Sequence, residues 1–525
     1  MADNEEKFDP EERSRGLQDI DPTIFWVSAI ISAALIVWGA IWTDHFGGII
    51  DEVFAFLTGN FAWLYLIFTS AILVIVIILG LSKYGQIKLG KPDDEPEYTT
   101  RSWIAMLFSA GMGIGLVFWG VAEPVMHYAA PPFGIEGETA EAATTAIGVS
   151  MFHWGFHPWA LYAFFGMILA YFSFRRGLPQ LPSSTLYPLF GKRGVKGPLG
   201  KIFNILAVFA TLFGIATSLG LGAQQINGGL NELFGIAISN TNATIIVVLV
   251  TIAFIISAVT GIDKGIKYLS NINITIGGIL LVMMIVLGPT VFILDFLTQG
   301  IGNYVGNIFD YSFFTSPVEG SPWPGWWTIF YWAWWIAWTP FVGGFIARIS
   351  KGRTIKEFVA GVVLVPAVVG LVWFSTMGGS GIWLEQFGAG GVIDPVHEDI
   401  ASAFFVVLTQ FPLGMLMAIL ATILISTFFI TSADSGTFVM GMLTSKGKLN
   451  PSTQVKVTWG VLEGLIAAVL ILAGGLEALQ TASIAGAFPF MLFLLLAIAG
   501  MFKALNRDVR HLERGEFIGD IDLEY

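Results

Sequence analysis

The stretch FYWAWWIAWTP, residues 330–340, gathers four tryptophans within seven positions of a segment that is otherwise apolar. Residues 325–347 together reach the roughly 20 apolar residues that a helix needs to cross the hydrocarbon core of a bilayer. Tryptophans in such helices usually lie at the two membrane–water interfaces. At about 1.5 Å of rise per residue, however, Trp332 and Trp338 lie roughly 10 to 20 Å below the outer end of the segment. The stretch therefore predicts a membrane-spanning helix with indoles gathered near its middle.

The whole chain has the composition of an integral membrane protein. Of its 525 residues, 55% are hydrophobic and 12% are charged, and its mean hydropathy is +0.74, values that a soluble domain with a solvated surface does not sustain. Cysteine is absent, which excludes disulfides and thiolate metal sites. The apolar runs predict an all-α integral membrane protein with 12 transmembrane helices. Their expected bounds are 22–43, 61–83, 101–128, 141–174, 199–234, 242–260, 269–297, 325–347, 357–384, 400–444, 456–475 and 481–503.

The positive charges indicate the topology, because Lys and Arg in short loops collect on the cytoplasmic side of a membrane. With the N-terminus inside, all 26 Lys and Arg residues fall in cytoplasmic segments, whereas the outer loops carry acidic residues and supply much of the net charge of −12. We therefore predict a multi-pass protein of the cell (inner) membrane with both termini in the cytoplasm.

Two of the predicted helices carry signals for an interruption at membrane depth. In SAGMGIGLVFWG, residues 109–120, Gly111, Gly113 and Gly115 alternate, which does not place them on one helical stripe and favours an unwound segment. Pro340 predicts a kink in the eighth helix. Non-helical backbone in a bilayer is tolerated only where it lines a cavity walled by protein, so a central binding site is expected. The two interruptions lie five helices apart, as in two five-helix repeats of opposite orientation.

Two aromatic clusters are expected at similar depth. They belong to WGFHPWALY (154–162) and to the opening stretch, and they comprise Trp154, Trp159, Tyr162, Trp334, Trp335 and Trp338. With no carboxylate apparent nearby in the middle of the membrane, such walls favour a cation without hydrogen-bond donors, a quaternary ammonium or a sulfonium. Cation–π attraction contributes roughly 2 kcal/mol or more per contact when the pair is desolvated. A carboxylate on the same ligand can be received by the electropositive N-terminal end of the broken helix.

At these residues the sequence resembles a known family. GMGIGLVFWGVAEP (111–124), WGFHPWALY and FYWAWWIAWTPFVGGFIARISKGRTIKEF (330–358) together are similar to the betaine/carnitine/choline transporter (BCCT) family, over essentially all of residues 20–505. The pattern is closest to that of the sodium-coupled glycine betaine transporters. The resemblance implies a LeuT-like core of two inverted five-helix repeats, preceded by two extra helices, with alternating access around a midplane site. The expected segments are a cytoplasmic tail (1–21), two peripheral helices (22–100), the first repeat (101–297), an outer connection (298–324), the second repeat (325–503) and a short cytoplasmic tail (504–525).

The resemblance also implies the roles of individual residues. The six aromatic residues hold the trimethylammonium group, Phe341 and Phe345 gate the pocket on the inner side, and Ala110 and Met112 belong to the unwound stretch that contacts substrate. The implied sodium site joins this stretch to FFITSADS (428–435), with hydroxyl oxygens from Thr431 and Ser432 and carbonyl oxygens from Ser109, Met112 and Phe428. The alternative for the two hydroxyls is a hydrogen bond back to their own helix.

Two positions bear on coupling and substrate. A second sodium site of the family uses two threonines on the fifth helix; here only Thr211 remains, with Ile215 at the other position, so this site is altered, rebuilt around Thr217 or Ser218, or missing. Choline importers of the family that are coupled to protons carry an aspartate at the position of Gly115, and its absence favours a zwitterion such as glycine betaine.

The sequence thus predicts a sodium symporter that imports glycine betaine, or a close quaternary ammonium solute, for osmoprotection. Alternatives within the class are carriers of dimethylsulfoniopropionate, carnitine or choline; alternatives from other classes are a betaine sensor without transport, which should append a soluble output domain, and a channel. No enzymatic activity, nucleic-acid partner or cofactor is expected apart from sodium as the coupling ion. A homotrimer surrounded by membrane lipid is implied by the resemblance. His153 and His157 are four residues apart, but no third metal ligand is evident, so helix packing is the favoured interpretation.

Overall fold

The computed structural model describes residues 16–111, 113–260, 263–521 and 523, with their side chains except at 16, 108–111, 257–260 and 263–268. The described part is helical almost throughout and contains no β-strand, which confirms the all-α fold. Its α-helices are α1 (Pro22–Ile41), α2 (Thr43–Leu81), α3 (Thr100–Gly111), α4 (Ile114–Ala129), α5 (Ala140–Trp154), α6 (Phe156–Ala170), α7 (Tyr187–Phe190), α8 (Lys192–Lys196), α9 (Pro198–Phe234), α10 (Asn240–Thr260), α11 (Asp263–Leu287), α12 (Thr290–Gly306), α13 (Ile308–Phe313), α14 (Phe330–Arg348), α15 (Ile355–Phe387), α16 (Ile393–Glu398), α17 (Ala403–Leu408), α18 (Gly414–Thr444) and α19 (Thr453–Leu512).

Eight of the described helical segments are long and apolar enough to cross a membrane. They are Pro22–Ile41, Thr43–Leu81, Pro198–Phe234, Leu269–Leu287, Gly325–Arg348, Ile355–Phe387, Gly414–Thr444 and Thr453–Leu512. These segments agree with a multi-pass membrane protein. They do not reproduce twelve separate spans, because several predicted spans are divided into shorter helices and the last two are joined.

The third predicted span is divided where the alternating glycines indicate. α3 ends at Gly111 and α4 begins at Ile114, with extended backbone at Gly113 (φ −163°, ψ 179°). The fourth span is also divided, which the sequence did not predict: α5 and α6 meet at Gly155. The Phe156 N–H freed there donates to the hydroxyl of Tyr304 at 3.0 Å, so this interruption is satisfied inside the protein.

Prolines account for two further divisions. The seventh predicted span is separated at Gly288 and Pro289 into α11 and α12, since proline cannot donate a helical hydrogen bond. The tenth is separated at residues 409–413, which include Pro412, into α17 and α18. Both prolines lie at a division between two helices, and neither division was predicted.

The interruption predicted at Pro340 is not present, because α14 continues through this residue to Arg348. A proline removes a single helical hydrogen bond, and α14 is packed against α6, α9 and α19. The start predicted for the second span is wrong as well. α2 begins at Thr43 because Phe46, Ile50 and Leu57 recur at helical spacing and are buried.

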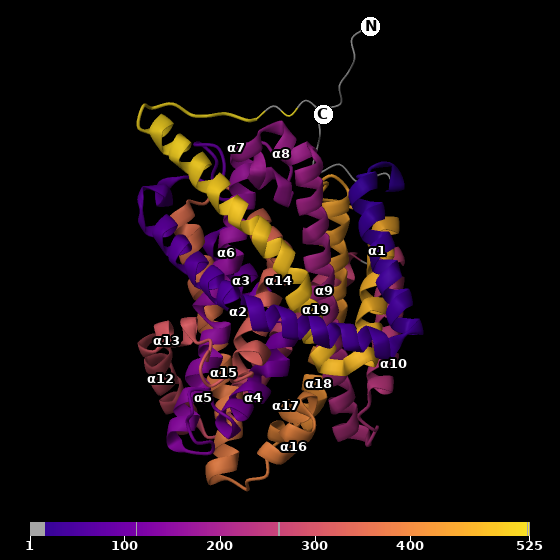
Figure 1. The fold of residues 1–525 in the computed structure, drawn as a ribbon. Coiled ribbons are helices and arrows are strands. Elements are labelled where there is room, and N and C mark those ends of the chain that lie inside the picture. Colours follow the sequence, from indigo (N-terminus) through magenta and orange to yellow (C-terminus); the bar gives the residue numbers. More distant parts are fainter. Residues whose placement is uncertain (1–15, 112, 261–262, 522, 524–525) are drawn as a thin grey trace.

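α14 lies inside the bundle, with α6 on one side and with α9 and α19 on the other, and α18 packs against α9 (Figure 1). The two ends of the described chain lie at one end of this bundle. Asp21 donates its N–H to the carbonyl of Thr444 at 2.8 Å, and Lys196 of α8 donates to the carbonyl of Leu523 at 2.9 Å. Figure 1 shows α7 and α8 at this end, opposite α16 and α17.

α19 takes the place of the last two predicted spans and changes direction at Gly474 and Gly475. Gly475 has φ +57° and ψ −129°, a combination that is open to glycine and strained for other residues. The change of direction lets one chain segment pack against both α2 and α9.

We expect Gly475→Ala to lower the free energy of unfolding by about 1–3 kcal/mol, because alanine must adopt this conformation. The measurement is thermal unfolding of the purified protein in detergent. Gly48→Ala is the control, since Gly48 lies within helix α2 with no heavy atom within 4 Å of an added Cβ; it should leave stability unchanged or raise it. Equal melting temperatures for Gly475→Ala and the wild type would contradict the strain argument.

Candidate functional site

A cavity of about 660 Å³ lies among α3, α4, α5, α6, α11, α14, α15 and α18. The predicted site residues whose side chains are described converge on it, with the exception of Thr211. Those that line it are Trp154, Trp159, Tyr162, Trp334, Trp335, Trp338, Phe341, Phe345, Phe428, Thr431 and Ser432. Segments more than 270 residues apart in the chain, from Trp154 to Ser432, therefore form one site.

Three indoles of α14 are held by backbone acceptors. Trp334 and Trp338 both donate their Nε1–H to the carbonyl oxygen of Gly214 on α9, at 3.2 and 2.8 Å, and the Ser218 hydroxyl donates to the same oxygen. Trp335 donates its Nε1–H to the carbonyl of His153 at 3.1 Å. These indole N–H groups are therefore used within the protein and are not available to a ligand.

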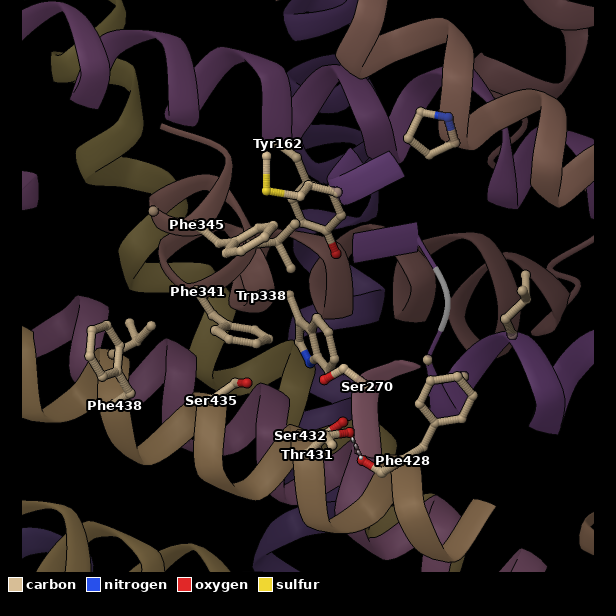
Figure 2. Close-up of a pocket in the computed structure, with 18 of the residues that line it drawn as sticks. Tyr162, Ser270, Trp338, Phe341, Phe345, Phe428, Thr431, Ser432, Ser435 and Phe438 are labelled. Atoms are coloured by element: carbon tan, nitrogen blue, oxygen red, sulfur yellow. Dashed lines mark hydrogen bonds between the residues drawn. The ribbon is translucent and has the colours of Figure 1, made fainter. Parts of the chain in front are cut away.

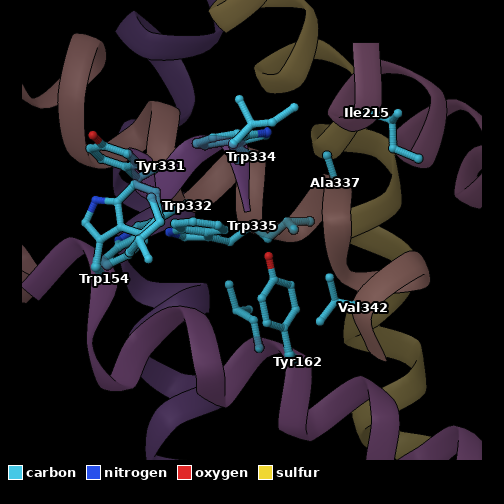
Figure 3. Packing of buried hydrophobic residues seen from close by; sticks show 14 of the residues in the cluster. Trp154, Tyr162, Ile215, Tyr331, Trp332, Trp334, Trp335, Ala337 and Val342 are labelled. Atoms are coloured by element: carbon cyan, nitrogen blue, oxygen red, sulfur yellow. The ribbon is translucent and has the colours of Figure 1, made fainter. Parts of the chain in front are cut away.

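The cluster from α5 and α6 faces the indoles of α14 (Figure 3). The ring of Trp154 lies edge-on to Trp335, with centroids 4.8 Å apart and an interplanar angle of 83°. Tyr162 lies 6.1 Å from Trp335 and 5.4 Å from Trp159. Among the described atoms its hydroxyl is buried without a hydrogen-bond partner. We call Trp154, Trp159, Tyr162, Trp334, Trp335 and Trp338 the aromatic cage.

Glycines allow the helices to approach the cage closely. A Cβ at Gly115 would lie 2.4 Å from a ring carbon of Trp334 and 3.1 Å from one of Trp154. A Cβ at Gly214 would lie 2.7 Å from Trp338. Both positions exclude any side chain while the indoles keep these places.

Exposure of the cavity-lining side chains rises toward the C-terminal end of α14. Trp334 and Trp335 are 1% and 7% exposed, Trp338 and Phe341 are half-buried, and Phe345 is 39% exposed. The cavity extends in the same direction as far as Arg348 at the end of the helix. Figure 2 shows Phe341 and Phe345 beyond Trp338 on this route. The cage is thus reached from the C-terminal end of α14.

The hydroxyl motif of α18 also faces the cavity (Figure 2). The hydroxyl of Thr431 donates to its own helix, with the carbonyl oxygens of Thr427 and Phe428 both at 3.1 Å. It also accepts a hydrogen bond from the side-chain amide of Asn273 on α11, at 3.3 Å. Phe428, Thr431 and Ser432 thus line the same cavity, and Thr431 makes the bond back to its own helix that was the alternative to ion binding.

The remaining predicted residues of the unwound stretch cannot be placed. Met112 lies outside the described residues, and the side chains of Ser109 and Ala110 are not described. The adjoining Gly113 and Gly115 line the cavity. The N-terminus of α4, which begins at Ile114, therefore lies at the cavity wall.

Thr211 does not contribute to the cavity lining. Its buried hydroxyl donates to the carbonyl of Ala207 at 2.7 Å. Thr217 bonds Phe213, Leu479 and Ser483. The hydroxyls on this part of α9 are thus used in helix packing.

Glu123 of α4 is a site residue that the sequence reasoning missed. Its carboxylate is fully buried and accepts hydrogen bonds from the indole of Trp154 (2.8 Å) and the hydroxyl of Tyr331 (2.6 Å). The expectation of a cage without a nearby carboxylate is therefore wrong. The available signal was an acidic residue inside the apolar run VFWGVAEPVM, because ionisable residues in membrane helices are costly and usually functional.

The histidines are arranged differently from the spacing in sequence. His153 Nδ1 lies 2.6 Å from Glu123 Oε1, and His127 Nε2 lies 3.4 Å from the same oxygen, whereas His157 bonds Ser312. Glu123 and His127 therefore join His153 in a group of three potential ligands, whereas the sequence had shown no third ligand for the pair His153 and His157. The 2.6 Å distance is that of a hydrogen bond, since two ligands of one tetrahedral zinc ion lie about 3.3 Å apart.

The comparison with known proteins agrees with this geometry. Residues 23–510 match the model of the betaine/carnitine/choline family transporters. The glycine betaine transporter OpuD of Bacillus subtilis is 48% identical over 94% of this chain and 96% of its own. A probable glycine betaine transporter of Desulfitobacterium hafniense is 45% identical over 94% of this chain and 99% of its own. An ectoine/hydroxyectoine transporter of Virgibacillus pantothenticus is 43% identical over 94% of this chain and 98% of its own.

The family match spans nearly the whole chain, including the divided third helix, the aromatic cage and the hydroxyl motif of α18. Relatives of this similarity are transporters and not enzymes. The chain belongs to the betaine/carnitine/choline transporter family.

Proposed function

We propose that the protein imports glycine betaine across a cell membrane by sodium symport with alternating access, and so serves osmoprotection. The observation that carries the proposal is the aromatic cage around one end of the cavity. The relatives that are named as glycine betaine transporters support the same substrate. The proposal includes a homotrimer with both termini in the cytoplasm, for which the support is the family resemblance.

The chemistry of the cage favours a methylated cation. The N–H groups of four indoles (Trp154, Trp334, Trp335 and Trp338) are bonded to protein oxygens, so these rings offer a ligand only their electron-rich surfaces. A trimethylammonium group has no hydrogen to donate and needs no acceptor, and its positive charge is attracted to such surfaces. An amine would need acceptors that these indoles do not supply.

The carboxylate end of the ligand is assigned to α4, and the sodium ion to α18 and the unwound stretch. The N-terminus of α4 at Gly113 and Ile114 has no side-chain cap, and the backbone N–H groups of a helix N-terminus suit a carboxylate. The sodium ion is assigned to neutral oxygens of Phe428, Thr431 and Ser432 together with the unwound stretch; neutral oxygens can replace the hydration shell of a monovalent cation. Binding would replace the bonds of Thr431 to its own helix.

The coupling claim is tested by uptake of labelled glycine betaine into proteoliposomes, with and without an inward sodium gradient. We expect accumulation only with the gradient. Among unlabelled competitors, dimethylsulfoniopropionate should compete better than ectoine, whose cyclic cation carries N–H groups that the cage leaves without acceptors. Accumulation that ignores sodium would refute symport, and stronger competition by ectoine would refute the substrate assignment.

Replacement of one cage indole tests the cation–π argument. Trp338→Leu removes an aromatic surface and should weaken betaine binding by about 2 kcal/mol, roughly 30-fold in the dissociation constant. Trp63→Leu is the matched control, because Trp63 lies on α2 with 53% of its surface exposed. This variant should bind betaine with the affinity of the wild type. The measurement is titration calorimetry with the purified protein. Retained affinity in Trp338→Leu would count against the cage.

The direction of access can be measured because the natural chain has no cysteine. A cysteine at Phe345 should react with a membrane-impermeant maleimide added from the cytoplasmic side, since this position is exposed at the mouth of the cavity. A cysteine at Val318, which is 96% exposed in the connection before α14, should react from the outside. Labelling of both positions from the same side would contradict the proposed topology.

A further inference from the structure

Glu123 lies behind the aromatic cage and contacts both of its walls. It is on α4, whose backbone break lines the cavity, and it is fully buried. Its Oε2 accepts from the Trp154 indole on α5 at 2.8 Å and from the Tyr331 hydroxyl on α14 at 2.6 Å. One carboxylate therefore joins the two helices whose indoles face each other across the cage.

The third contact extends this support to Trp335. His153 Nδ1 lies 2.6 Å from Glu123 Oε1, and the His153 carbonyl accepts the indole N–H of Trp335 at 3.1 Å. The ring of Tyr331, bonded to Glu123, also stacks on Trp335 with centroids 6.2 Å apart and an interplanar angle of 16°. Both neighbours of Glu123 thus hold the same indole.

The hydrogen-bond partners are consistent with an ionised carboxylate. An indole N–H can only donate, and it shares Oε2 with the Tyr331 hydroxyl. His153 Nε2 lies 2.9 Å from the hydroxyl of Thr328, which can donate to it and leave Nδ1–H to donate to Glu123. In this arrangement three donors converge on two oxygens and no carboxyl proton is needed.

Among the described residues, no Lys or Arg pairs with Glu123. Within the described part of the chain, the ion-pair partners of Glu123 are His127, at 3.4 Å, and His153. The titratable groups that face it are His127 on α4 itself, His153 on α5 and Tyr331 on α14. A negative charge here lies one indole away from the cavity.

We propose that Glu123 is the countercharge and positioning residue of the cage, and that it selects a cationic headgroup over a neutral one of the same shape. This inference rests on the proposed transport of a betaine-like solute. A carboxylate that accepts the indole N–H adds electron density to the Trp154 ring, which strengthens its attraction for a cation. Its charge also acts directly on the cation through a region of low dielectric constant, where screening is weak. A neutral ligand gains from neither effect.

The test compares glycine betaine with 3,3-dimethylbutanoate, which has the same shape but a carbon in place of the charged nitrogen. The preference is the ratio of their inhibition constants against labelled betaine binding to the purified protein. We expect Glu123→Gln to lower this preference about tenfold or more, with little change in the affinity for the neutral analogue. Tyr331→Phe removes one hydrogen bond and keeps the charge, so it should lower both affinities in proportion and leave the preference unchanged.

The outcomes separate the two proposals. If the wild type does not prefer betaine over its neutral analogue, the proposed function fails. If the wild type prefers betaine and Glu123→Gln keeps that preference, or weakens both ligands equally, the role of Glu123 is overturned while transport of betaine stands. Trp154→Phe gives a second measurement, because it retains a ring without the N–H. Trp154→Phe should lower the preference for betaine about threefold. An unchanged preference in Trp154→Phe overturns the proposal even if Glu123→Gln does not fold.

Discussion

The carbonyl oxygen of Gly214 accepts the indole N–H groups of both Trp334 and Trp338, and the geometry of the cage depends on this shared acceptor. An indole N–H away from water is stabilised by an acceptor inside the protein. By supplying it from α9, the protein fixes the rotation of α14 and turns the ring surfaces toward the cavity. Position 214 must be glycine for this to happen, because a Cβ would lie 2.7 Å from Trp338.

Two other cage indoles are also bonded to acceptors on neighbouring helices. Trp335 is bonded to a backbone carbonyl of α5, and Trp154 to the carboxylate of Glu123 on α4. Four of the cage indoles, Trp154, Trp334, Trp335 and Trp338, are thus each held by a helix other than their own. A change in the relative position of α4, α5, α9 and α14 must therefore alter the cage as a whole. This links the shape of the pocket directly to the packing of the bundle.

The features that the sequence predicts are those encoded by local pattern. The alternating glycines at 111, 113 and 115 indicate the division between α3 and α4, and the tryptophan spacing places three indoles on one face of α14. Family resemblance brings α18 to the same cavity, which local pattern alone cannot do because Trp154 and Thr431 are distant in the chain. Pro340 does not interrupt its helix, which continues to Arg348.

What the sequence does not show depends on side chains that meet only in the folded protein. Glu123 has no partner near it in sequence except His127, and its contacts with Trp154 and Tyr331 require three helices to be in place. The amphipathic start of α2 is missed for a different reason: its acidic residues lower the hydropathy, while its buried side chains keep a helical period. Average hydropathy detects spans, and periodicity is needed to detect helices that lie along a surface.

The contact of Gly115 with two cage tryptophans limits how such a carrier can acquire a new specificity. An added Cβ would lie 2.4 Å from the ring of Trp334, so an acidic side chain of the kind that proton-coupled choline importers carry at this position does not fit beside the present indoles. An acidic side chain at position 115 would require α14 to change as well. Intermediates with only one of the two changes would have a distorted pocket, so laboratory evolution of the substrate range should start from paired substitutions on α4 and α14.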